Sequence, residues 1–178
     1  MRIGTRLAAM GTAGIVAWGL AYGQSSSGQS FADRTETSRS ETSRSDAVRV
    51  EATRAEKELF AAVNEARRNQ GMAPLRWSDS LAAAARRHAA AMAEHREAQH
   101  GFEGEPSLAE RVKQAGAHFV WLSENVTQGP KPEFIHTQFM HSSGHRANIL
   151  DADMNSIGVG VVEQGGQLFA VEDFADLR

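Results

Sequence analysis

Two short segments of this 178-residue chain combine residue types that could do chemistry. The run Ser123-Glu124-Asn125-Val126 places a carboxylate at the end of an apolar stretch, where burial costs free energy unless the group has a partner. The run from Gly144 to Leu150 brings His145, an arginine and an asparagine together before apolar residues. His100 follows a predicted helix and could turn its imidazole towards the same place, although spacing alone does not require the three segments to meet.

These three side chains allow two roles that the sequence leaves open. The imidazoles of His100 and His145 and the Glu124 carboxylate form a plausible, weak set of ligands for a divalent cation such as zinc, with open coordination positions. Alternatively, Glu124 accepts a hydrogen bond from His145 and fixes the loop. The first role requires the two histidine side chains to lie within about 8 Å of each other, because metal–nitrogen bonds are short.

A catalytic role needs a nucleophile, and the sequence offers only a weak one. The chain has no cysteine, which excludes disulfides, thiolate zinc sites and cysteine nucleophiles. It also lacks the Gly-x-Ser-x-Gly and His-Glu-x-x-His motifs of many hydrolases. A hydrolase with His145 as base, Glu124 as its orienting group and Ser142 as nucleophile is therefore an alternative, and a non-enzymatic role is favoured.

Helical patterns supply most of the framework that must position these side chains. A first amphipathic pattern ends at Gly71. Ser78 then caps a second helix, and His88 lies on its apolar stripe, which is more typical of a core histidine than of a ligand. A capping box opens a third helix at Ser107, and Pro132 opens a fourth.

Strand patterns dominate the rest of the chain. Residues 119–126 alternate weakly, and residues 157–162 form an apolar run typical of a buried strand. Gly165-Gly166 indicates a hairpin turn, after which residues 168–174 form the returning strand. Helices followed by a strand meander predict an α+β fold.

The first fifty residues differ in composition from the remainder. Residues 1–23 have two early arginines, an apolar run and small residues at the end, which predicts a signal peptide or, if it is not cleaved, a membrane anchor. Residues 24–50 are rich in Ser, Thr, Arg and Glu and predict a disordered linker. Residues 51–178 form the predicted domain, which either reading places outside the cytoplasmic membrane, with no membrane insertion beyond a possible N-terminal anchor.

The charge of the predicted domain argues against one class of partner. From residue 51 onward the chain carries 13 basic and 18 acidic residues, so the domain is mildly acidic. Binding to nucleic acid requires a basic face that neutralises phosphates. We therefore expect no nucleic-acid partner.

An ordered set of motifs over about 125 residues resembles the bacterial branch of the CAP superfamily, whose domain is also called the SCP domain. The superfamily includes cysteine-rich secretory proteins, venom antigen 5 and plant pathogenesis-related proteins. The matching residues are Pro74-Leu75-x-Trp77, Leu81-x3-Ala85-x2-His88-Ala89-x2-Met92-Ala93, His100, Glu124-Asn125-Val126, Ser142-x-Gly144-His145-Arg146-x-Asn148-Ile149-Leu150, Gly158-Val159-Gly160 and Asp173-Phe174-Ala175.

The resemblance implies a three-layer α-β-α sandwich with a central antiparallel sheet and a cleft that carries two histidines and two acids. His100, Glu124 and His145 match three of these positions. Ser142 stands where animal members carry the second acid, so the resemblance implies a ligand-binding cleft with a looser hold on any metal. It also implies a secreted or envelope-associated binding module for a small apolar molecule, a surface glycan or a protein. A protease-like hydrolase and a cell-wall structural module are the alternatives.

Overall fold

A computed structural model describes residues 52–178 of the chain. The predicted signal peptide or anchor, residues 1–23, and the predicted linker, residues 24–50, lie outside the described residues. The described part folds as a single layered unit, with its helices and strands as follows: α1 Arg54–Asn69, β1 Arg76–Trp77, α2 Asp79–His95, α3 Leu108–Gln114, β2 Phe119–Gly129, α4 Pro132–His141, α5 Ser143–Ile149, β3 Ser156–Gln164 and β4 Gln167–Leu177.

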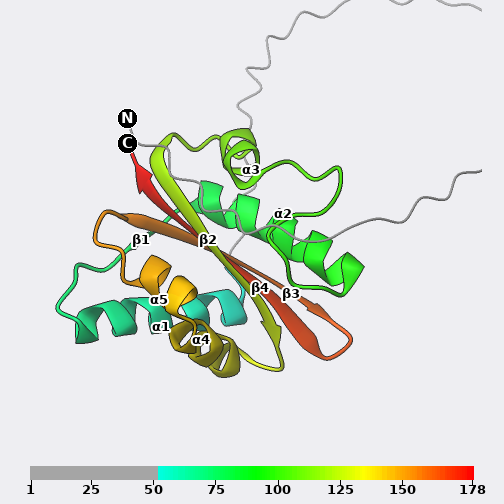
Figure 1. Ribbon diagram of the computed structural model, residues 1–178, viewed down its shortest axis with the longest axis horizontal. Helices are drawn as coiled ribbons and strands as arrows, with labels where there is room; N and C mark the ends of the chain where they lie inside the picture. The colour runs from blue at the N-terminus through cyan, green and yellow to red at the C-terminus, as the bar shows by residue number, and fades with distance from the viewer. Residues whose placement is uncertain (1–51) are drawn as a thin grey trace, which may run out of the picture. The chain divides into compact units, whose positions relative to one another are not determined.

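The sheet has four strands in the order β1-β3-β4-β2. β4 is antiparallel to both β2 and β3, whereas the short β1 runs parallel to β3. Helices α2 and α3 lie on one side of this sheet, and α1, α4 and α5 lie on the other (Figure 1). The predicted α-β-α sandwich is therefore confirmed, and β2, which carries Glu124, is an edge strand.

Local capping explains where three of the helices begin. Thr53 and Glu56 form a capping box at α1, and Ser107 forms one at α3. The side chain of Ser78 accepts a hydrogen bond from the backbone N–H of Leu81 at the start of α2. The predicted starts of the second and third helices are thus confirmed.

The segment from Gly144 to Leu150 is more regular than its sequence indicated, since no helix or strand was predicted there. Most of it forms α5, a seven-residue helix that follows α4 directly. Ser142 ends α4 and is also the N-cap of α5, where its side chain accepts from the N–H of His145. A helix of two turns is too short to show a periodic pattern, so periodicity did not reveal it.

The central strand β4 divides the core between the two helical layers. Phe169, Val171 and Ala175 pack with residues of α2 and α3, whereas Ala170 and Phe174 pack with residues of α1, α4 and α5. Alternation along a strand then directs Asp173 towards the α2 layer and Glu172 towards the α1 layer. Both carboxyl groups are fully buried.

Close contact between α2 and β3 depends on Gly158 and Gly160. A Cβ atom at Gly158 would lie 2.0 Å from the backbone nitrogen of Ala82, and one at Gly160 would lie 2.3 Å from the backbone of Ala85. Because a side chain has no room at either position, glycine sets the distance between helix and sheet. This contact fixes α2, and with it His88, over the sheet.

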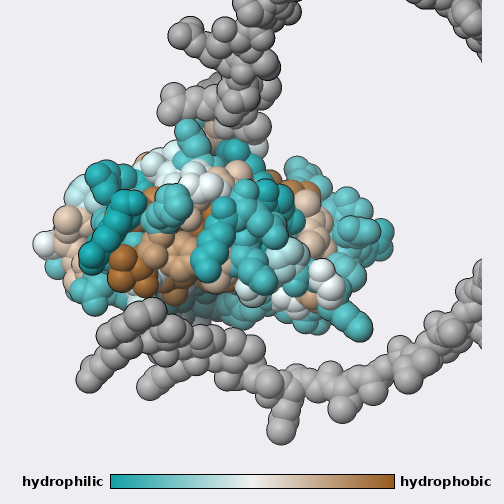
Figure 2. All heavy atoms as spheres, turned by 90° about the horizontal axis from the view of Figure 1, so that it is seen from above, coloured by the Kyte–Doolittle hydropathy of each residue, from teal (hydrophilic) through white to brown (hydrophobic). Residues whose placement is uncertain are grey.

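The surface of the described domain is mixed rather than uniformly polar. Hydrophilic residues cover most of the face seen from above, with a smaller apolar area among them (Figure 2). Val120 and Phe134 are the large hydrophobic residues that are exposed in the described part of the chain. No helix within residues 52–178 is long and apolar enough to cross a membrane.

Candidate functional site

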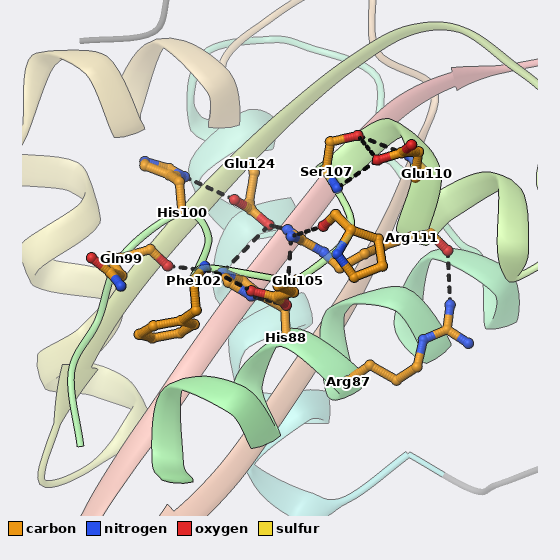
Figure 3. A network of polar contacts seen from close by, with 11 residues as sticks. Arg87, His88, Gln99, His100, Phe102, Glu105, Ser107, Glu110, Arg111 and Glu124 are labelled. Carbon is orange, nitrogen blue, oxygen red and sulfur yellow. Dashed lines mark hydrogen bonds and ion pairs between the residues drawn. The ribbon is translucent and has the colours of Figure 1, made fainter. Parts of the chain in front are cut away.

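Glu124 lies on β2 with its side chain directed into the layer formed by α2 and α3. The side chain is only 4% exposed, and one of its oxygens, Oε2, lies 2.8 Å from Nδ1 of His100. The other oxygen, Oε1, accepts a hydrogen bond from Nη2 of Arg111 (Figure 3). Two of the predicted site residues, Glu124 and His100, are therefore brought together, and Arg111 joins them.

Arg111 comes from α3 and is almost as buried as Glu124, with 3% of its side chain exposed. Its Nη1 atom donates to the carbonyl oxygen of Pro106 at 3.0 Å and lies 3.6 Å from Oε1 of Glu105. The guanidinium thus faces carboxylates from two segments, Glu105 in the connection between α2 and α3 and Glu124 on β2. Such contacts offset the large cost of burying a charge.

His88 extends this network into the core. Its Nδ1 atom lies 2.7 Å from Oε1 of Glu105, and its Nε2 atom lies 2.8 Å from the carbonyl oxygen of Gln99 (Figure 3). The residue has no exposed surface. The prediction that His88 belongs to the core is confirmed, and the residue tethers the connection between α2 and α3 at two points.

His145 approaches the site from the opposite helical layer, on α5. The edge of its ring packs against Phe139, with ring centroids 5.2 Å apart. Burial lowers the pKa of His145, and the nearby charge of His100 lowers it further, so the imidazole is neutral at neutral pH. The proposed hydrogen bond between Glu124 and His145 is wrong for the described residues, because the side-chain partners of Glu124 are Arg111 and His100.

A second polar network holds α5 against the edge strand. The amide nitrogen of Asn125 donates to the carbonyl oxygen of His145 at 3.2 Å and to Oε2 of Glu172 at 3.1 Å. Asn148 donates to Oδ1 of Asn125 at 2.9 Å and to the carbonyl oxygen of Glu124 at 3.3 Å. The contacts to Glu124 and Asn125 satisfy polar groups at the edge strand and place His145 beside it.

Ser142, the predicted substitute for the second acid, has a structural role in this arrangement. Its hydroxyl accepts from the backbone N–H of His145 at 3.5 Å, which caps α5. Within residues 52–178 no hydrogen bond joins this hydroxyl to the His145 imidazole. The geometry therefore assembles no serine nucleophile with a base.

The described residues do not fit a metal ion. No group of three or more His, Asp or Glu side chains within residues 52–178 is arranged to hold one. Both oxygens of Glu124 are already hydrogen-bonded, and the guanidinium of Arg111 places a permanent cation beside them. A divalent ion at Glu124 would therefore meet a like charge.

Two buried acids, Asp173 and Glu172, complete the surroundings of the site. Burial raises the pKa of Asp173, and the charge of Glu124 raises it further. Burial raises the pKa of Glu172 to about 8, so this group is protonated at neutral pH. Oε1 of Glu172 has no hydrogen-bond partner within the described residues, whereas the neighbour of the Asp173 carboxyl is Glu124.

Two residues of the site, Glu105 and Arg111, were not singled out from the sequence, and Asp173 was noted only within the matching motif Asp173-Phe174-Ala175. Asp173 carried a signal, since it interrupts an apolar strand where a charged residue is unusual. Glu105 and Arg111 carried none, because a charged residue in a connection or a short helix is ordinarily solvated.

Comparison with known proteins agrees with this architecture. In Bacillus subtilis (strain 168), the uncharacterized protein YkwD is 33% identical over 111 residues, which are 62% of this chain and 43% of YkwD. The uncharacterized membrane protein YlbC of the same organism is 29% identical over 111 residues, which are 60% of this chain and 31% of YlbC. The chain thus spans less than half of the length of either relative.

Solved structures show the same fold. An extracellular SCP-domain protein from Bacillus anthracis str. Ames has a TM-score of 0.63 at 22% identity, over 68% of this chain and 40% of that protein. An outer surface protein from Borrelia burgdorferi has a TM-score of 0.66 at 18% identity, over 72% of this chain and 97% of that protein.

The family model that matches residues 60–174 is described as CAP, the Cysteine-rich secretory protein family. The match runs from within α1 to within β4 and includes every residue of the predicted site. On this match and the shared sandwich, the chain belongs to the CAP family.

Proposed function

We propose that this CAP domain is a non-enzymatic binding module that takes a small ligand with an apolar portion between α1 and α4. The observation that carries the proposal is a cavity of about 320 Å³ on the surface between these two helices, which is open to solvent. Ligand sites in proteins are commonly concave, mostly apolar and about 300–1,000 Å³ in volume. The cavity is at the small end of that range, which favours a small molecule or one segment of a larger one.

The lining of the cavity suggests that such a ligand has both apolar and polar parts. Ala62, Ala66 and Met140 supply apolar surface, and the polar groups come from Glu65, Asn69, Gln70 and His136. Burial lowers the pKa of His136, so its imidazole is neutral at neutral pH. Nδ1 of His136 is buried without a hydrogen-bond partner within the described residues, so a ligand reaches it only when the imidazole turns towards the cavity.

The polar site around Glu124 supports a binding role rather than catalysis. Its acid is neutralised by Arg111, and its nearest serine caps a helix. General acid–base and nucleophilic catalysis both require a reacting group with a free path to substrate. The Glu124 side chain has no such path, because it is only 4% exposed and both of its oxygens are hydrogen-bonded.

Binding can be tested with a pair of tryptophan variants on α1. Ala62 lines the cavity and is half-buried, whereas the adjacent Ala61 is exposed. Displacement of anilinonaphthalene sulfonate by n-alkyl carboxylates of increasing length would report binding. We expect Ala62→Trp to weaken binding about tenfold or more by filling the cavity, and Ala61→Trp to bind as wild type does. Equal binding by both variants would contradict the proposed location.

We also propose that the domain acts outside the cytoplasm, in the envelope or the medium. Solved relatives described as an extracellular protein and an outer surface protein support this location. Fractionation of cells that express the full chain would test it. Recovery of the protein from the medium, the wall or the outer face of the membrane is expected, and recovery from the cytoplasm alone would contradict it.

A further inference from the structure

The site at Glu124 contains a cation that belongs to the chain itself. Arg111 is 3% exposed and lies against Glu124 from β2 and Glu105 from the connection between α2 and α3. It also donates to the carbonyl oxygen of Pro106 at 3.0 Å. A divalent ion joins separate acidic segments in the same manner, by attracting oxygen ligands from each.

The histidine beside Arg111 is oriented as a donor rather than as a metal ligand. Nε2 of His88 lies 2.8 Å from the carbonyl oxygen of Gln99, which can only accept a hydrogen bond. That nitrogen therefore carries a proton, and its lone pair is not available to an ion. Its other neighbour, Oε1 of Glu124 at 4.0 Å, is also an acceptor.

The charges around Arg111 show why a cation is needed. Glu105 and Glu124 come from two different segments, and their side chains are only 12% and 4% exposed. Buried ionised carboxylates that lack a counter-charge are strongly destabilising. Arg111 contacts both Glu105 and Glu124 and carries a permanent charge. His88 is also near both acids, at 2.7 Å from Glu105 and 4.0 Å from Glu124.

We propose that Arg111 takes the place of a divalent ion at this site, so that the domain closes the segment 96–107 over the sheet without a metal. His100 lies in this segment, and its imidazole is 62% exposed while its Nδ1 rests on Glu124. Arg111 is therefore a positioning residue. Through its contacts with Glu124 and Glu105 it holds the exposed side chain of His100 in place. The inference rests on the contacts of α3 and does not depend on the cavity between α1 and α4.

Thermal unfolding of the full chain in EDTA and in a small molar excess of ZnCl₂ tests the inference. We expect wild type to melt at the same temperature in both solutions. Arg111→Met should melt about 10 °C lower in EDTA, because Glu105 and Glu124 lose their counter-charge. Zinc should restore part of that loss by supplying the missing charge between the two acids.

Two matched variants make the result specific. Arg87→Met removes an arginine that donates to the carbonyl oxygen of Arg111 but contacts neither acid, and its melting temperature should not depend on zinc. The double variant Arg111→Met/Glu124→Gln removes one of the two acids and should not be restored by zinc. Restoration in either control would mean that zinc acts at another site, which would overturn the inference.

Other outcomes also decide the question. A wild-type melting temperature that rises with zinc, and no longer rises in His100→Ala, would show a metal site and overturn the inference. An Arg111→Met protein that melts with wild type in EDTA, or that zinc does not restore, would overturn it too. If Arg111→Met does not fold, Arg111→Lys carries the test, since it keeps the charge and should melt lower than wild type yet show no response to zinc.

Discussion

Glu124 and Asp173 lie directly opposite each other on the antiparallel strands β2 and β4, and both carboxyl groups are buried on the same face of the sheet. Their electrostatic situations differ. Glu124 is paired with Arg111, whereas burial and the charge of Glu124 raise the pKa of Asp173. Glu124 therefore has a counter-charge, whereas burial and the neighbouring charge favour the protonated form of Asp173.

This asymmetry predicts opposite tolerance to isosteric amides. Glu124→Gln leaves the buried Arg111 without its closest counter-charge, and we expect it to lower the free energy of unfolding by about 3 kcal/mol or more. Asp173→Asn replaces an acid whose protonated form is favoured by burial with a neutral amide of similar shape, and we expect a change of less than about 1 kcal/mol at neutral pH. Urea unfolding measures both. Equal losses of unfolding free energy in the two variants would contradict the expected difference between Glu124 and Asp173.

Glu172 predicts a dependence of stability on pH. Its pKa is raised from 4.5 to about 8, so the folded state keeps a proton that the unfolded state has released. Stability therefore falls as pH rises through this window, by about 1.4 kcal/mol per pH unit for one such group. Glu172→Gln should remove this contribution.

The comparison of Glu172→Gln with wild type isolates the effect, because other groups also titrate. Asp173 contributes with the same sign, whereas His136 and His145, whose pKa values are lowered, make stability rise with pH below their ordinary value of 6.5. Unfolding free energies measured at several pH values for both proteins give the difference in slope. Identical slopes would show that Glu172 titrates normally.

The close contact of α2 with β3 at Gly158 leaves no room for a larger residue at this position. In Gly158→Ala the new methyl group would overlap the backbone of α2, which cannot rotate away as a side chain can. We expect a loss of about 3 kcal/mol or failure to fold, at the upper end for overpacking. Gly101→Ala is the matched control, since a Cβ atom at Gly101 would meet nothing within 4 Å. Thermal melting of the two variants would separate them clearly, and similar midpoints would contradict the close approach.

The side chain of Arg67 connects α1 to the end of α5 by hydrogen bonds, and we expect these bonds to stabilise the fold. It is buried and donates to the carbonyl oxygens of Ala73, Ile149 and Asp151 at 2.8–2.9 Å. Arg67→Met leaves these three acceptors unsatisfied, and we expect it to cost about 3 kcal/mol in unfolding free energy. Arg68→Met, at the exposed adjacent position, should change stability by less than about 0.5 kcal/mol. Comparable losses would show that the arginine charge matters more than these contacts.

Much of the fold was predictable from local sequence signals. The N-caps Ser78 and Ser107 act over three residues, so their effect is present in the sequence itself. The Gly165-Gly166 turn has positive φ at both residues, which glycine adopts without strain. In contrast, α5 was missed because a helix of seven residues has almost no periodicity of its own and depends on contacts to β2.

The sequence by itself determined the family and most of the helices and strands, and through the family resemblance it grouped His100, Glu124 and His145 in one site. Only the tertiary structure decided that Glu124 pairs with Arg111, that His145 faces the site from another layer, and that Asp173 lies beside both charges. Spacing along a chain specifies which side chains share a helix face or a strand face. The partner of a buried charge, however, is set by how separate elements pack across the sheet, and this determines which group stays ionised.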